Sequence, residues 1–192
     1  ELLSPHIKPL SQELFEWQNA DYIKNNAHPE HLNHETITGS YVRSKSEEMI
    51  HMVLYKNKIP FRYECGLKLD DFTYYPDFTI RHPKTGETYY WEHFGKMDDA
   101  DYSKNVFSKL QHYTSHGIVP TIQLITTYET KNNPFTINNA EKIVNAEVLA
   151  EITKTPEILE DNDQPVIRIE EPMIALVENG TYTVTWNGIE YL

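Results

Sequence analysis

The sequence predicts an α/β fold that contains at least one pair of parallel strands. Two segments, 42–57 and 98–116, carry apolar residues with helical spacing, and three strand-like segments lie between them. A fourth strand-like segment, 119–128, follows the second of these helices. The order helix, three strands, helix, strand is typical of α/β proteins. Because a helix connects the third strand to the fourth, that pair of strands is expected to be parallel.

The first predicted helix covers residues 10–17, with Ser11 placed to cap its amino end. The polar stretch 25–39 is expected to be a loop. The helix over 42–57 has an amphipathic stripe formed by Met49, Ile50, Val53 and Leu54. The helix over 98–116 has one face formed by Tyr102, Val106, Leu110 and Tyr113, and Gly117 is suited to the position just past its end.

The three strands between the helices are predicted at 61–69, 72–82 and 88–94. Asp70-Asp71 separates the first two, and the turn sequence Pro83-Lys84-Thr85-Gly86 separates the second from the third. The turns are short, so consecutive strands are expected to be neighbours in one sheet.

The C-terminal part has weaker signals. Residues 139–152 predict a helix, and the acidic stretch 156–172 is expected to be irregular. Segments 174–177 and 181–186 flank the turn Glu178-Asn179-Gly180 and predict a hairpin, after which Asn187-Gly188 makes a second tight turn. The chain is therefore divided into an N-terminal extension, a core and a C-terminal extension, with bounds at 1–40, 41–130 and 131–192.

Composition narrows the classes of function. The 192 residues include 17 Lys and Arg against 29 Asp and Glu, which gives a net charge of −12. Proteins that coat nucleic acid through bulk charge are basic, because their phosphate contacts come from Lys, Arg and backbone N–H groups. The net charge therefore disfavours non-specific coating of DNA. A site in which bound metal cations meet a phosphate is still allowed.

The sequence also bears on the setting of the protein. No apolar run approaches the roughly 20 residues that a bilayer-spanning helix needs, and no secretion leader is visible. Cys65 is the only cysteine, which excludes an intrachain disulfide and a multi-cysteine zinc site. These features favour a reducing, cytoplasmic setting. The chain opens at Glu1 rather than Met, which suggests a piece of a longer product or assembly.

Two carboxylates interrupt apolar strand segments, Asp77 in 72–82 and Glu92 in 88–94. A lone carboxylate in such a place costs several kcal/mol unless a positive group compensates it. Since a short turn joins the two strands, the two acids are expected to lie side by side. A divalent cation is the natural compensation, because Mg²⁺ is held by one or two carboxylates, waters and substrate phosphate. For either acid alone, a solvent-facing or edge-strand position is the alternative.

A third acid, Glu47, lies one turn before Ile50 and two turns before Leu54, so it shares their core-facing stripe. The alternative is a capping box in which Ser44 and Glu47 close the amino end of the helix. The joint occurrence of one helix acid and two strand acids favours a shared site. In that site Glu47 holds a second cation or a metal-bound water.

Histidines offer a second candidate. His28, His31 and His34 recur at intervals of three, a spacing that a zinc site accepts. Pro29 is unfavourable for a helix at this point and no cysteine assists, so a solvated loop is the favoured interpretation. His93 alternates to the sheet face opposite Glu92 and is expected to be structural.

The ordered set Glu47, Pro76-Asp77 and Glu92 resembles the PD-(D/E)XK nuclease superfamily, over about residues 42 to 129. Three segments look like a bacterial and phage branch of that group: 42–47 (VRSKSE), 75–78 (YPDF) and 91–95 (WEHFG). The resemblance implies a restriction-endonuclease-like mixed sheet flanked by helices, to which the N-terminal helix and the C-terminal hairpin are added. It also implies Mg²⁺ between Asp77 and Glu92 and hydrolysis of phosphodiester bonds.

The sequence departs from the family at one position. The family places Lys two residues after the second acid, on the same face of the strand, where this chain has Phe94. A lysine from another element is expected to supply the missing ammonium. The candidates, in order of preference, are Lys109, Lys96 and Lys45.

The leading hypothesis is a nuclease dependent on Mg²⁺, with Mn²⁺ as a plausible substitute. Its substrate is nucleic acid, with DNA favoured and RNA as the alternative. The lysine would orient or deprotonate the attacking water, and the metal would take up charge on the phosphate. Tyr102 and Tyr113 are interpreted as core aromatics, with a phenol near the scissile phosphate as the alternative.

The competing hypothesis is a catalytically degenerate module of the same fold that binds nucleic acid or a partner protein. Phe94 and the net charge favour that module, whereas the three acids favour the enzyme. A third class, a pure protein-interaction domain, would place the acids on separate faces.

Overall fold

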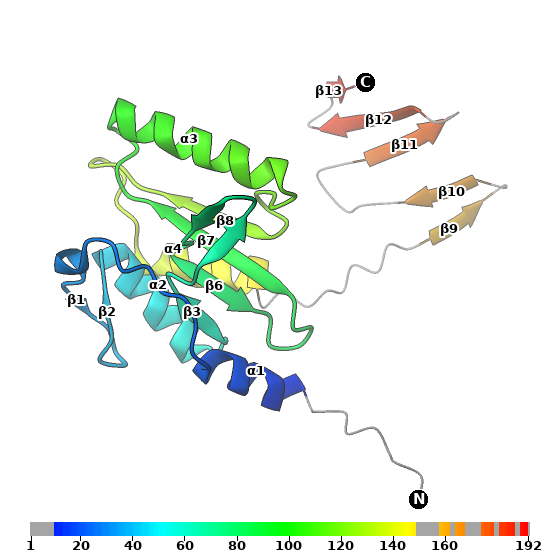
Figure 1. Ribbon diagram of the computed structural model, residues 1–192. Helices are drawn as coiled ribbons and strands as arrows, with labels where there is room; N and C mark the ends of the chain where they lie inside the picture. The colour runs from blue at the N-terminus through cyan, green and yellow to red at the C-terminus, as the bar shows by residue number, and fades with distance from the viewer. Residues whose placement is uncertain are drawn as a thin grey trace, which may run out of the picture. The chain divides into compact units, whose positions relative to one another are not determined.

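The computed structural model describes residues 10–148 and, beyond them, the strands between residues 158 and 191 (Figure 1). The chain divides into two compact units, Glu1–Leu149 and Ala150–Leu192. The first unit holds all the candidate site residues. Within the described residues, no helix has the length and apolarity needed to cross a membrane.

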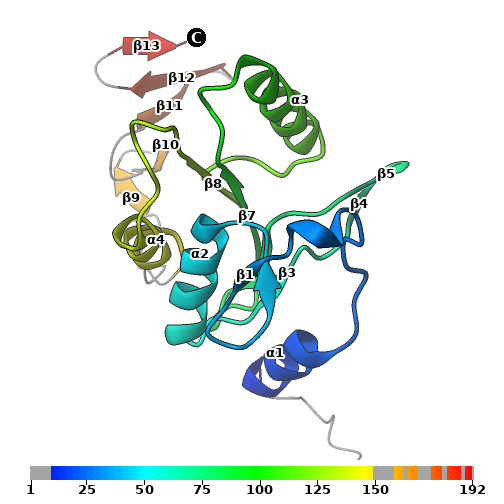
Figure 2. The ribbon, with the colours of Figure 1, turned by 90° about the vertical axis from the view of Figure 1, so that its left-hand side faces the viewer.

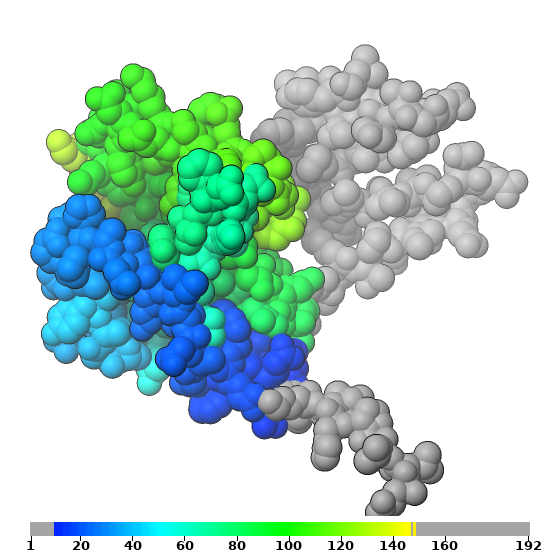
Figure 3. Space-filling model, in the orientation of Figure 1, coloured from blue at the N-terminus to red at the C-terminus, as the bar shows by residue number. Residues whose placement is uncertain are grey.

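The first unit begins with α1 (Leu10–Asn19), followed by the 3-10 turn η1 (Pro29–His31) and the short strands β1 (His34–Glu35) and β2 (Tyr41–Val42). The helix already includes Leu10, so the prediction that Ser11 caps it is wrong. The Arg62 guanidinium lies 4.6 Å from the centre of the Trp17 ring and donates to the Trp17 carbonyl, which ties α1 to the core. Figure 3 shows this N-terminal segment, in blue, lying over the surface of the first unit.

A mixed sheet of four strands forms the centre of the first unit. Its strands are β3 (Phe61–Tyr63), β6 (Phe78–Arg81), β7 (Thr88–Phe94) and β8 (Leu124–Tyr128), in the order β3-β6-β7-β8. The first two pairings are antiparallel, and β7 and β8 are parallel. The predicted parallel pair and the mixed sheet flanked by helices are therefore confirmed.

Helices cover both faces of this sheet (Figure 2). On one face lie α2 (Lys45–Lys56) and α4 (Ile137–Ile143), which continues as the π-helical turn η2 (Val144–Val148). On the other face lies α3 (Ala100–Ser115). The first face is closed by a large apolar cluster that includes Leu54, Phe78, Ile80, Trp91 and Val144. A smaller cluster on the α3 face contains Leu69, Tyr113, Ile118 and Leu124.

Two predicted strands are each broken in two, which corrects the sequence-based boundaries. The predicted strand 61–69 is β3 and β4 (Leu67–Leu69), separated at Glu64, whose φ of 44° no extended strand allows. The predicted strand 72–82 is β5 (Phe72–Tyr74) and β6, separated around Pro76, which has no N–H for a ladder. As a result, β4 and β5 pair with each other and leave the main sheet.

Two further boundaries differ from the prediction. The fourth strand begins at Leu124 rather than 119, because the preceding residues form a turn in which Thr121 has a φ of 68°. The helix predicted over 139–152 begins at Ile137, and its described part ends at Val148.

In the second unit, β9 (Ile158–Asp161) and β10 (Gln164–Ile167) form one antiparallel hairpin, so the expectation of an irregular 156–172 is wrong for these residues. The predicted hairpin is confirmed as β11 (Ile174–Glu178) and β12 (Thr181–Trp186). A third strand, β13 (Ile189–Tyr191), pairs with β12.

Candidate functional site

Asp77 and Glu92 lie opposite each other on the α3 face of the sheet. The register of β6 and β7 pairs Phe78 with Trp91, and both rings belong to the core on the α2 face. Side chains alternate along a strand, so the neighbouring pair, Asp77 and Glu92, points toward the α3 face. Opposed residues have Cβ atoms about 4.5–5.5 Å apart. Asp77 is not inside a strand as predicted but directly before β6, where its Oδ2 accepts the backbone N–H of His93 at 2.7 Å.

Helix α3 supplies two donors to the second acid. Glu92 is only 2% exposed. Its Oε1 accepts from the Nζ of Lys109 at 2.6 Å and from the hydroxyl of Tyr113 at 2.7 Å. Lys109 and Tyr113 are four residues apart on α3, so they lie on one face of it and reach the same oxygen. Of the three candidate lysines, Lys109 is therefore the one that the structure brings to the acids.

The other two lysines lie elsewhere. Lys45 is an exposed residue that pairs with Glu48 at 2.9 Å along the first turn of α2. Lys96 lines a surface pocket between the end of β7 and the segment after β8, together with Asp98, Glu129 and Lys131. Phe94 stacks on Tyr128, with ring centres 5.4 Å apart, and its side chain has no proton to exchange.

The electrostatics of the pair depend on burial and on like charges. Burial raises the pKa of Asp77 well above its ordinary value, and the negative charges of Glu92 and Glu47 raise it further. Burial also raises the pKa of Glu92, against the opposing effect of Lys109 and Tyr113. Among the described residues, Lys109 is the one cation within ion-pair distance of this pair of acids, and its contact is with Glu92. Incompletely compensated negative charge of this kind attracts a further cation.

Glu47 is held by the amino end of α2. Ser44 caps the helix by accepting the N–H of Glu47 at 3.1 Å, so the capping alternative is confirmed in that half. The returning bond differs from a capping box, because the Glu47 carboxylate accepts the N–H of Arg43 at 2.9 Å. Its carboxylate also accepts from the hydroxyls of Ser44 at 2.9 Å and Tyr63 at 2.6 Å. Tyr63 is a partner that the sequence analysis missed.

Whether a divalent cation fits beside Asp77 and Glu92 depends on which carboxylate oxygens are free to bind it. Asp77, Glu92 and Glu47 do not form a group with all ligand atoms within 4.8 Å of one another; among the described residues only His28, Glu30 and His31 do. Asp77 and Glu92 nevertheless each lie one residue beyond the paired Phe78 and Trp91, and Asp77 accepts the N–H of His93, the residue after Glu92. Within residues 10–148, neither Oδ1 of Asp77 nor Oε2 of Glu92 has a hydrogen-bond partner. Two carboxylates with one open oxygen each fit Mg²⁺, which keeps several waters.

Two tyrosines of α3 lie close to the acids. Tyr113, expected as a core aromatic, is buried as predicted but also bonds Glu92, and its position four residues after Lys109 was the available signal. Burial and the charge of Glu92 raise the pKa of the Tyr113 hydroxyl, so it stays protonated and donates. Burial likewise raises the pKa of Tyr102, with a contribution from the Asp77 charge.

His93 lies on the opposite face, as expected of a structural residue. Its ring packs on Phe135 with centres 4.7 Å apart, and its Nδ1 lies 2.9 Å from the hydroxyl of Thr127. Its Nε2 lies 3.3 Å from Glu129. Glu129 also accepts from Ser46 and from the N–H of Phe135, a network for which no sequence motif gives a signal.

The histidine segment differs from its prediction. Pro29 does not prevent a helical turn but begins one, because the first position of a helix needs no N–H. The turn gathers His28, Glu30 and His31, whereas His34 lies on β1 and is not in the group.

Comparison of the chain with protein-family models, with curated proteins and with solved structures finds no match.

Proposed function

We propose that the protein is a Mg²⁺-dependent nuclease of the PD-(D/E)XK type whose lysine has moved from strand β7 to helix α3. The observation that carries this proposal is the 2.6 Å contact between Lys109 Nζ and Glu92 Oε1. The motif position for that lysine is Phe94 on the strand. Because the Lys109 ammonium lies beside Glu92, the combination of two acids and one lysine is kept, although Phe94 stands where the motif has its lysine.

In this proposal the residues have distinct roles. Asp77 and Glu92 would hold Mg²⁺, or Mn²⁺, through their open oxygens, and the ion would supply charge neutralisation at the phosphate. Lys109 would orient the attacking water as an ammonium or, in its neutral amine form, accept the proton of that water. Tyr113 fixes the orientation of Glu92 by bonding the same oxygen as Lys109. Glu47 holds the amino end of α2 and adds negative charge to the site.

The net charge of −12 bears on how the protein would bind its substrate. A strongly acidic chain repels a phosphate backbone unless cations bridge the two. Metal at Asp77 and Glu92 would provide such a bridge at the site itself. Nucleic acid, with DNA favoured, is therefore the proposed substrate, and binding is expected to need the divalent ion.

The experiment is cleavage of labelled single- and double-stranded DNA and of RNA, with Mg²⁺, with Mn²⁺ and with chelator. The key variants are Asp77→Asn and Lys109→Met. The matched control is Lys104→Met, on the same helix, because the Lys104 side chain is 79% exposed and pairs only with Asp101, at 3.6 Å. Metal-dependent cleavage that both key variants lose and the control keeps would support the proposal.

If the wild type cleaves none of these substrates, the proposed activity is wrong. The degenerate-module hypothesis then takes its place. One observation favours the degenerate module: Glu92 is bonded to Lys109 and Tyr113, and a carboxylate with its own ammonium partner does not need a metal ion for charge compensation.

A further inference from the structure

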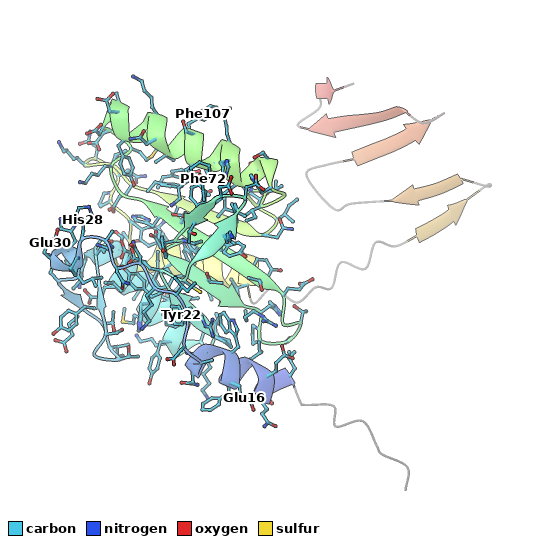
Figure 4. All side chains as sticks on the ribbon, in the orientation of Figure 1. Glu16, Tyr22, His28, Glu30, Phe72 and Phe107 are labelled. Carbon is cyan, nitrogen blue, oxygen red and sulfur yellow. The ribbon has the colours of Figure 1, made fainter. Side chains whose placement is uncertain are left out.

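The turn η1 carries a second group of metal-ligating side chains, separate from the acids of the sheet. Ligand atoms of His28, Glu30 and His31 all lie within 4.8 Å of one another. Nδ1 of His28 is 3.1 Å from Oε1 of Glu30, and Nε2 of His31 is 3.9 Å from the same oxygen. Figure 4 shows His28 and Glu30 beside each other at the edge of the first unit.

These separations are close to those of a bound ion. Zinc bonds of about 2.0–2.1 Å to nitrogen and oxygen place tetrahedral ligands about 3.4 Å apart. The measured separations of 3.1 and 3.9 Å bracket that value. Small side-chain rotations would therefore bring the three atoms around one ion. The two imidazole rings are stacked, with centres 5.2 Å apart and planes 14° apart. Because an imidazole binds a metal ion in its ring plane, one of the two rings must turn for both to reach the same ion.

The backbone of the turn is fixed by contacts that do not involve the proposed ligating side chains. His28 adopts the left-handed conformation (φ 52°, ψ 56°), and its carbonyl accepts the N–H of His31 at 3.0 Å. The Arg43 guanidinium donates to the carbonyls of Ala27 at 2.6 Å and His28 at 2.7 Å. Arg43 is itself held by the buried Glu64 at 2.6 Å. Since the backbone is already ordered, binding an ion would restrict only side chains.

The donor types select a class of metal. Imidazole nitrogen together with one carboxylate suits zinc and its neighbours in the first transition row, whereas Mg²⁺ and Ca²⁺ prefer all-oxygen sites. Three protein ligands leave one tetrahedral position for water. We propose that His28, Glu30 and His31 bind one divalent transition metal ion, with Zn²⁺ as the preferred occupant, independently of the carboxylates at Asp77 and Glu92.

The position of this site connects it to the rest of the first unit. Arg43 holds the turn through its side chain and donates its backbone N–H to Glu47 at 2.9 Å. An ion on the turn would therefore stabilise the segment between α1 and α2 and, through Arg43, the amino end of α2. This stabilisation does not depend on nuclease activity.

The test uses the full chain without an affinity tag that contains histidine. Zn²⁺ binding is measured by titration calorimetry, and Co²⁺ is used as a spectroscopic probe whose visible absorption reports a four-coordinate site with nitrogen ligands. We expect one ion per chain, and binding at least about tenfold weaker in His31→Ala and in Glu30→Gln. All three side chains are more than 60% exposed, so these variants are expected to fold.

Two controls make the test specific. His34→Ala removes the histidine that the sequence spacing predicts but the turn excludes, and it should bind Zn²⁺ as the wild type does. Asp77→Asn should also keep Zn²⁺ binding, which separates this site from the proposed nuclease site. Equal binding by wild type and His31→Ala, or no Zn²⁺ binding at millimolar concentration, would overturn the proposal.

Discussion

The two faces of the central sheet are built from the same strands but bury different chemistry. On the α2 face, Phe78 and Trp91 are fully buried in a continuous apolar cluster. One residue away along the same strands, Asp77 and Glu92 point to the α3 face beside Lys109. Apart from the polar network of His93, Thr127 and Glu129, the first face follows from packing, because it removes apolar surface from water. The second face includes the buried acids Asp77 and Glu92, which packing does not require, and they are therefore the candidates for a functional role.

The first prediction is that the apolar α2 face contributes most of the free energy of unfolding. Trp91→Ala should lower the free energy of unfolding by about 3–5 kcal/mol, because it opens a large cavity and leaves the Thr127 hydroxyl without the indole N–H that donates to it at 2.9 Å. Chemical denaturation measures this. A loss below about 1 kcal/mol would show that the face is not the main core.

The second prediction concerns the lysine on the α3 face. Lys109→Met should reduce the cleavage rate by about 10²–10⁴-fold, the range for an acid–base group, while the fold is kept. Lys104→Met should leave the rate unchanged. Single-turnover cleavage with saturating Mg²⁺ measures the effect, and circular dichroism checks the fold of each variant. Equal rates for the two variants would remove Lys109 from the mechanism.

The third prediction tests whether charge on the α3 face opposes folding. The pKa of Asp77 is raised above its ordinary 3.8 by burial and by the neighbouring carboxylates, so the protonated form is favoured in the folded state. This group therefore stabilises the fold at low pH and loses that contribution as pH rises through its folded pKa. Asp77→Asn should be more stable than the wild type at neutral pH.

The pH dependence provides the check on the third prediction. The stability gain of Asp77→Asn should shrink as pH falls to 3.8 and below, because the wild-type carboxyl becomes protonated in both states only below its ordinary pKa of 3.8. Thermal midpoints of both proteins across this range, without divalent metal, measure the difference. Mg²⁺ should raise the midpoint of the wild type and not that of the variant. A variant less stable than the wild type at pH 7 would contradict the argument.

The smallest effect is expected on the outer side of α3. Phe107 is 63% exposed, so Phe107→Ser should change the free energy of unfolding by less than about 0.5 kcal/mol. The same denaturation experiment measures it. A loss comparable to that of Trp91→Ala would mean that this side of α3 is covered.

Much of the fold was open to prediction from local patterns. The helices over 42–57 and 98–116 and the strand over 88–94 are present because their apolar periodicity continues over several turns or the full strand. The predicted strands 61–69 and 72–82 are broken in the structure at Glu64, which has a positive φ, and around Pro76, which has no N–H. Periodicity gives no warning of a left-handed Glu64 or of the point at which a hairpin leaves the sheet.

The candidate site shows the same division. Asp77 and Glu92 stand out in sequence because an acid among apolar residues is unexpected at short range. Lys109 could be ranked but not chosen, because a contact between β7 and α3 depends on how the helix packs across the sheet. Tyr63 gives no signal at all, since its bond to Glu47 joins segments that only the folded chain brings together.

The sequence by itself determined the element order, the parallel pair and the presence of acids in strand contexts, because these depend on residue types at short spacing. Only the tertiary structure decided that Lys109 rather than Lys96 or Lys45 meets Glu92, and that Glu30 rather than His34 joins His28 and His31. The physical reason is that side-chain convergence depends on backbone direction. A helix rotated by one residue turns its side chains by about 100°, which would be enough to carry Lys109 away from Glu92.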